Sequence, residues 1–148
     1  MLDNAEKIGL QVEKRNIMKN PSFDIDYNVT NHAGKTPLYY ACNHGLYSII
    51  KLFLHHSQEK NIDFNMTDQI GNTPLHCACR NGQRKIVKLI LDNAEDKGID
   101  IEKRTVKNKT AKGDAKQRGH SRISQLFREL RKSKRKHGNA FLEISEAP

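Results

Sequence analysis

The chain has 148 residues, of which 36% are hydrophobic and 29% are charged, and its formal net charge is +9. This length is enough for one domain with a buried core. No apolar run approaches the ~18 residues that a membrane-spanning helix needs, which argues against a membrane protein. Three cysteines, an odd and sparse set, favour reduced thiols inside a cell over a disulfide framework. We therefore expect a cytoplasmic protein, with entry into the nucleus as an open alternative.

The positive charge is concentrated toward the C-terminus. Residues 1–102 carry 12 Lys/Arg and 13 Asp/Glu, whereas residues 103–137 carry 14 Lys/Arg and 2 Asp/Glu. A nearly neutral body thus precedes a strongly basic segment. Any partner recognised mainly by charge is expected to meet that segment.

The sequence repeats itself with a period of 37 residues. Residues 34–45 read GKTPLYYACNHG, and residues 71–82 read GNTPLHCACRNG. The register continues beyond this block, because residues 49–54 (IIKLFL) correspond to residues 86–91 (IVKLIL). An internal repeat of this length indicates a stacked repeat architecture.

Residues 1–29 are the first element in chain order. Residues 25–28 (IDYN) match residues 62–65 (IDFN) one period later, so the end of an earlier unit precedes the first clear copy. Farther upstream, Val12 and Ile17 are candidates for the apolar positions of an outer helix. We interpret residues 1–29 as an N-terminal helical segment, or partial repeat.

Two clear units follow, at residues 30–66 and 67–103, and each predicts a pair of helices. Thr36 precedes a proline, and this pair favours a helix start, because threonine caps free backbone N–H groups and proline lacks one. Gly45 is predicted to end the short helix in a left-handed conformation. Apolar pairs one turn apart then predict a second helix. Each feature recurs 37 residues later.

Residues 104–131 form a third copy that is in phase but degenerate. Lys112 stands where the clear units have Leu38 and Leu75. Terminal repeats are atypical because their outer side faces water, so this unit is interpreted as a C-terminal cap. Residues 132–148 are expected to form a tail that is first basic and then acidic and hydrophobic.

The order of turn, T-P-L-x-x-A, short helix, glycine, longer helix and I-D-x-N resembles the ankyrin repeat, over about residues 25–130. The resemblance implies an all-α solenoid of stacked antiparallel helix pairs, with about three repeats, the N-terminal partial repeat and a basic C-terminal extension. It also implies a hydrogen bond between Thr73 and His76, whose counterpart in the first unit is Tyr39. The period exceeds the ~33 residues of the standard unit. We expect the extra residues, at the end of the second helix around 55–60 and 94–97, to form one additional helical turn on the outer face.

The same resemblance implies a protein–protein interaction module, a scaffold or adaptor, that binds another protein on its concave face. We expect a monomer or part of a longer array. In this family, partners contact the turn tips and the solvent side of the short helices. The corresponding positions are His32, Ala33, Lys35, Asn43, His44, Gln69, Ile70, Asn72, Arg80, Asn81, Val106, Lys107, Lys109, Gln117 and Arg118. Ile70 is a candidate anchor because it is apolar at a turn tip. The alternative is that these are ordinary solvated turn residues.

Nothing in the sequence predicts a cofactor, a metal ion or catalysis. Cys77 and Cys79 form C-x-C rather than the C-x2-C of zinc sites, and together with Cys42 they are interpreted as core residues. The sequence contains no G-x-S-x-G, P-loop or H-E-x-x-H motif. We therefore do not expect an enzyme.

The basic segment supports a second hypothesis. Five positive charges lie within six residues, at Arg131, Lys132, Lys134, Arg135 and Lys136. Such runs are typical of nuclear-import signals and of nucleic-acid contacts. The alternative function is therefore a nuclear or nucleic-acid-associated adaptor acting through residues 103–137, although the segment lacks aromatics for base stacking. Two other interpretations of the basic segment are contact with an acidic partner and a solvated cap with no binding role.

Overall fold

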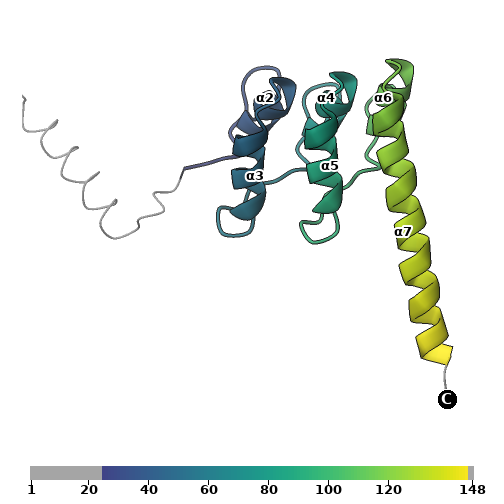
Figure 1. The fold of residues 1–148 in the computed structure, drawn as a ribbon. Helices are drawn as coiled ribbons and strands as arrows, with labels where there is room; N and C mark the ends of the chain where they lie inside the picture. The colour runs from purple at the N-terminus through teal and green to yellow at the C-terminus, as the bar shows by residue number, and fades with distance from the viewer. Residues whose placement is uncertain (1–24, 147–148) are drawn as a thin grey trace, which may run out of the picture.

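The computed structural model describes residues 25–146, with side chains through residue 136. Within these residues the protein is all-helical, as expected. Six helices form three consecutive pairs: α2 (Pro37–Asn43) and α3 (Tyr47–His55), α4 (Pro74–Arg80) and α5 (Arg84–Asp92), and α6 (Ala111–Gln117) and α7 (Ser121–Glu146). Figure 1 shows the three pairs standing side by side. The predicted partial repeat falls largely on residues 1–24, outside the described residues.

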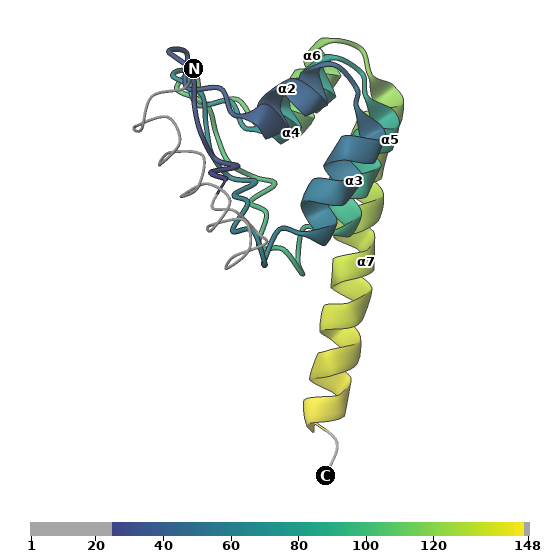
Figure 2. The ribbon, with the colours of Figure 1, turned by 90° about the vertical axis from the view of Figure 1, so that its left-hand side faces the viewer.

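The helices are arranged in two rows. Figure 2 shows the short helices α2, α4 and α6 one behind another in a single row, and α3, α5 and α7 in a second. The turns between pairs lie on the side of the short helices away from the second row (Figure 2). This arrangement is the stacked solenoid that the 37-residue period predicts.

The helix starts follow the predicted capping chemistry. The Thr36 hydroxyl oxygen accepts the Tyr39 backbone N–H at 3.1 Å, and Thr110 accepts the Gly113 N–H at 3.1 Å. Gly45 follows α2 with a φ of 70°, which a glycine adopts without the steric cost that a side chain would bring. Local sequence thus determines where each short helix begins and ends.

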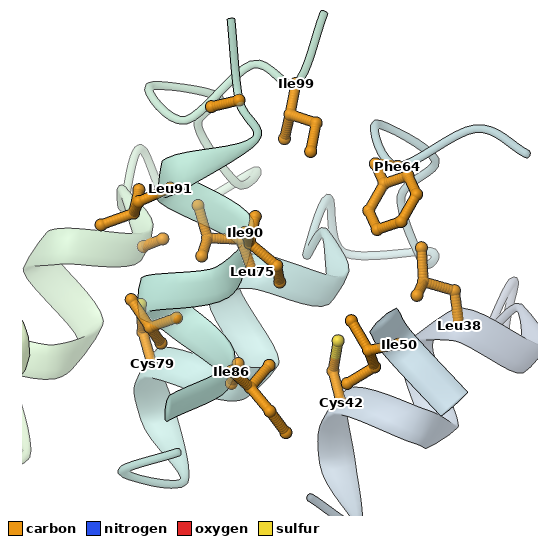
Figure 3. Packing of buried hydrophobic residues seen from close by; sticks show 14 of the residues in the cluster. Leu38, Cys42, Ile50, Phe64, Leu75, Cys79, Ile86, Ile90, Leu91 and Ile99 are labelled. Atoms are coloured by element: carbon orange, nitrogen blue, oxygen red, sulfur yellow. The ribbon is translucent and has the colours of Figure 1, made fainter. Parts of the chain in front are cut away.

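One core runs through all three pairs. Its members recur at equivalent positions, such as Ile50 and Val87, or Cys42 and Cys79. Figure 3 shows Cys42, Ile50 and Cys79 among the buried side chains of the first two repeats. Burial of each aliphatic side chain contributes roughly 1.5–3 kcal/mol to the stability of the folded state. Burial also raises the pKa of the Cys42 and Cys79 thiols, so both remain protonated core residues.

An asparagine side chain bonds to the segment that follows the long helix of the next repeat. Asn65 donates from Nδ2 to the Gly98 carbonyl at 2.8 Å and accepts the Asp100 N–H at 2.7 Å. Asn28 makes the same two bonds with Asn61 and Asp63, one repeat earlier. The last residue of the I-D-x-N motif therefore joins neighbouring repeats.

The extra residues of the 37-residue period form a further turn, but this turn is separate from the α-helix that precedes it. Helix α3 ends at His55, and the Ser57 hydroxyl donates to the Leu54 carbonyl at 2.9 Å, competing with the backbone ladder. The chain then makes an isolated turn, in which the Lys60 N–H bonds to the His56 carbonyl at 2.9 Å.

Helix α7 continues through the boundary that we placed between residues 131 and 132. It runs to Glu146, and Figure 1 shows it passing well beyond the ends of α3 and α5. The Lys134 ammonium lies 3.2 Å from the Glu95 carboxylate, which tethers α7 to the second repeat. Across residues 25–146, no helix has the length and apolarity needed to cross a membrane.

Candidate protein-binding surface

The turn tips are joined to one another by backbone hydrogen bonds. The Gln69 N–H donates to the Ala33 carbonyl at 3.1 Å, and the Val106 N–H donates to the Ile70 carbonyl at 3.0 Å. The Gln69 side chain also donates to the His32 carbonyl. The tips and the exposed side of α2, α4 and α6 are called the tip face below. It corresponds to the surface that the resemblance names concave.

A hollow of about 250 Å³ lies in the tip face between the second repeat and the cap. Its rim carries Ile70 and Val106, which are 54% and 72% exposed. Its lining residues are Ile70, Asn72, Arg80, Thr105, Val106, Lys107, Lys109, Asp114, Gln117 and Arg118. An exposed apolar rim beside several cations therefore surrounds a preformed depression.

A chain of polar contacts forms the floor of this hollow. The Arg80 guanidinium donates from Nη2 to the Asn72 Oδ1 at 2.8 Å and to the Asp114 Oδ2 at 3.0 Å. Asn72 in turn donates to the Asp68 carboxylate at 3.0 Å. Because Asn72 is only 2% exposed and fully engaged here, it cannot present its side chain to a partner. The structure therefore places this expected contact residue in the floor of the hollow rather than on its exposed rim.

The first repeat contributes a different surface to the tip face. The Tyr40 and His44 rings stack with centroids 6.5 Å apart, and Asn31 donates to the Tyr40 hydroxyl at 2.6 Å. The Lys35 ammonium lies 5.2 Å from the centre of the Tyr39 ring. Burial, followed by the neighbouring Cys77, raises the pKa of the Tyr39 hydroxyl, so Tyr39 stays neutral. This end of the tip face is aromatic rather than basic.

Two expected contact residues bond to each other across the first repeat boundary. Asn81 donates from Nδ2 to the Asn43 Oδ1 at 2.8 Å, and the Cys77 thiol donates to the same oxygen at 3.2 Å. Asn43 and Asn81 are nevertheless exposed, so they both stabilise the boundary and remain accessible.

His76 joins the second repeat to the tip of the cap. The Thr73 N–H donates to its Nδ1 at 3.1 Å, and its Nε2 lies 3.1 Å from the Lys109 carbonyl. The Thr73 hydroxyl lies 2.8 Å from Nδ1, which is the contact that the resemblance implies. A neutral ring with its proton on Nε2 satisfies all three contacts. Burial lowers the pKa of His76, which favours this neutral form.

The expected contact residues thus fall into two groups. Ile70, Lys107, Lys109 and Arg118 meet at the hollow, where Lys109 also donates to Gln117 at 2.9 Å. His32, Lys35, Asn43 and His44 lie at the other end of the array, around α2. The basic run at Arg131–Lys136 lies on α7, away from both.

Two acids of this chain of polar contacts were not anticipated, Asp114 in the lining of the hollow and Asp68 behind Asn72. Asp114 is 3% exposed and lies on α6 between buried Ala111 and Ala115. Asp68 accepts the Asn72 and Ile70 N–H groups at 2.8 and 3.1 Å and so shapes the tip. The sequence offered one signal for Asp114. It is a charged residue at the position that Cys77 occupies one repeat earlier.

Metal-ligating side chains do not gather on the tip face. Across the part of the chain that the structure describes, no three His, Cys, Asp or Glu side chains are grouped as a metal site requires. Burial raises the pKa of the Cys77 thiol, and this thiol donates a hydrogen bond to Asn43.

The paired helices, bonded tips and shared core define the protein as a helical repeat solenoid. A family model described as ankyrin repeats in three copies matches residues 11–105, so the chain belongs to the ankyrin-repeat family. The match begins upstream of the first clear repeat and ends before α6, the first helix of the third pair. No curated protein matches the chain. Ankyrin repeats are in general modules for protein–protein interaction, and the chain is a module of this kind.

Proposed function

We propose that the protein binds an extended segment of a partner protein on the tip face, over the hollow between the second repeat and the cap. The observation that carries this proposal is the exposed pair Ile70 and Val106 at the rim of a preformed depression. Apolar side chains beside a pocket are typical of the anchors that dominate protein interfaces. An aliphatic or aromatic side chain of the partner fits this rim.

The charges around the hollow indicate an acidic partner segment. Asp114 balances the charge of Arg80, whereas Lys107 and Arg118 are exposed and form no ion pair within the described residues. Carboxylates of the partner would meet these two cations. Such complementarity steers association and fixes the register of the bound segment.

The bonded tips favour binding, because the surface needs little reordering. Backbone bonds hold Ile70 and Val106 in a fixed relation to each other. A preorganised surface loses less conformational entropy on binding than flexible loops do. Because the two side chains are held rigidly, their spacing selects partner segments whose apolar side chains match it.

A pull-down from nuclease-treated extract, followed by affinity measurement with the identified partner, tests the proposal. We expect Ile70→Ser/Val106→Ser and Lys107→Gln/Arg118→Gln each to weaken binding about tenfold or more, equivalent to about 1.4 kcal/mol. The matched control is Lys51→Gln/Lys85→Gln, which removes two exposed charges from the long helices. If the tip variants bind as tightly as the control, the tip face is not the binding surface.

A further inference from the structure

Helix α7 carries a row of basic side chains on the side away from the array. The row, called the basic face below, consists of Arg128, Arg131, Lys132, Arg135 and Lys136, all of which are exposed. At 3.6 residues per turn they fall within about 140° of the helix circumference. Ile123 and Phe127, on the opposite side, are buried against the array. Packing therefore fixes the direction in which the basic face points.

The charge of the basic face is not neutralised. Lys134 lies toward the array and pairs with Glu95, but none of the five residues of the basic face forms an ion pair within the described part of the chain. The one acid in this stretch, Glu129, accepts a hydrogen bond from Gln125. Five positive charges thus face solvent along about 12 Å of helix, at a rise of 1.5 Å per residue.

We propose that the basic face binds the phosphate backbone of a nucleic-acid duplex, independently of base sequence. Neighbouring cations on one helix face stand about 5–6 Å apart, a spacing that suits successive phosphates of one strand. A duplex carries one charge per about 1.7 Å of its axis and releases condensed counterions when cations bind. Because α7 projects beyond the array (Figure 1), its outer side is open to such a long polyanion.

The composition of the basic face favours nucleic acid over an acidic protein. No apolar or aromatic side chain lies among its five residues, whereas protein interfaces depend on such anchors. Exposed ion pairs between proteins contribute only about 0–1 kcal/mol each. Counterion release, by contrast, gives measurable affinity for nucleic acid from cations alone.

An anionic membrane surface fits less well. A helix that lies in a bilayer interface buries an apolar face among the lipids. In α7 that face is already used, because Ile123, Leu126 and Phe127 pack into the core of the array. Only the electrostatic part of membrane binding remains available to it.

Fluorescence anisotropy of the full chain with a labelled 20-base-pair DNA duplex, across a range of salt concentrations, tests the inference. We expect a dissociation constant of about 10⁻⁴ to 10⁻⁶ M at physiological salt and a slope of log K against log salt of about −4 to −5. Arg128→Gln/Arg135→Gln should make the slope shallower by about 2, because two phosphate contacts are lost. Glutamine preserves helix propensity, and circular dichroism checks the fold.

Three comparisons make the outcome decisive. Lys51→Gln/Lys85→Gln, with the same loss of charge, should leave the slope unchanged, and so should the tip-face variant Lys107→Gln/Arg118→Gln. If the tip-face variant loses duplex binding instead, the contact is misplaced and the proposal fails. Tighter binding to polyglutamate or to phosphatidylserine vesicles than to the duplex would overturn it in favour of an acidic protein or a membrane.

Discussion

Arg80 of α4 and Asp114 of α6 form an ion pair across the boundary between the second repeat and the cap, with 3.0 Å between Nη2 and Oδ2. One repeat earlier, the equivalent positions are Asn43 and Cys77, whose side chains share a hydrogen bond of 3.2 Å. The same two positions therefore join both boundaries, through a neutral contact in one case and an ion pair in the other.

Arg80→Ala should be the most destabilising change at this boundary, because it leaves the buried Asp114 carboxylate without its cation. Loss of one partner of a buried pair costs roughly 3–5 kcal/mol, and the partial exposure of Arg80 places the expected loss at the lower end. Asp114→Ala should cost less, since Arg80 keeps Asn72 and water. Urea denaturation measures both free energies of unfolding.

The first boundary supplies a matched test of this account. The double variant Arg80→Asn/Asp114→Cys places the neutral pair of the first boundary at the second. We expect it to be more stable than Arg80→Ala, because no buried charge is left unpaired. Equal stability of the two variants would contradict the role assigned to the ion pair.

His76 should make the stability of the protein depend on pH. Its pKa is lowered in the folded state, mainly by burial, so below about pH 6.5 the unfolded chain binds a proton more readily than the folded one. The contribution of His76 is therefore complete above that pH and is lost as the pH falls, by at most about 1.4 kcal/mol per pH unit. His76→Gln should flatten this part of the curve of unfolding free energy against pH; parallel curves would argue against it.

Asn65→Ala should destabilise the protein by roughly 1–3 kcal/mol, because two hydrogen bonds between repeats are lost. Asn65→Asp separates the two bonds, since a carboxylate still accepts the Asp100 N–H but cannot donate to the Gly98 carbonyl. We expect thermal unfolding to rank the three proteins as wild type, Asp and Ala in decreasing stability. An Asp variant as stable as wild type would show that the bond to Gly98 contributes nothing.

Gly71 and Gly98 both have positive φ, at 87° and 63°, but their surroundings differ. A Cβ at Gly71 would lie 3.0 Å from the Thr105 Cα, whereas one at Gly98 would meet nothing within 4 Å. Gly98→Ala should cost roughly 1–2 kcal/mol from the left-handed conformation alone. Gly71→Ala should cost distinctly more, because the backbone of the next tip must move. Chemical denaturation of both variants checks the difference.

Local chemistry explains why the helix starts could be predicted from the sequence. Thr36 and Thr73 cap helices through bonds to residues three positions along the chain. Gly45 and Gly82 likewise end helices through their own conformations. Such features need no knowledge of distant residues, and the 37-residue register then predicts the stacking.

The roles of individual tip-face residues depend on distant contacts and could not be predicted. Asn72 occupies the same tip position as exposed Lys109, yet Arg80 and Asp68 enclose it. The continuation of α7 past residue 131 could not be predicted for another reason. The apolar stripe ends at Leu130, but helix continuity depends on propensity, and the residues that follow are mostly good helix formers.

The backbone bonds between the tips leave the side chains of Ile70 and Val106 without a structural role. The bonds from Gln69 to Ala33 and from Val106 to Ile70 use only main-chain atoms. Ile70 and Val106 can therefore be exchanged for other side chains while the scaffold keeps its register. New recognition residues can thus be introduced at these two positions, one tip at a time, with little loss of stability. Binding preference can change in this way while the scaffold stays the same.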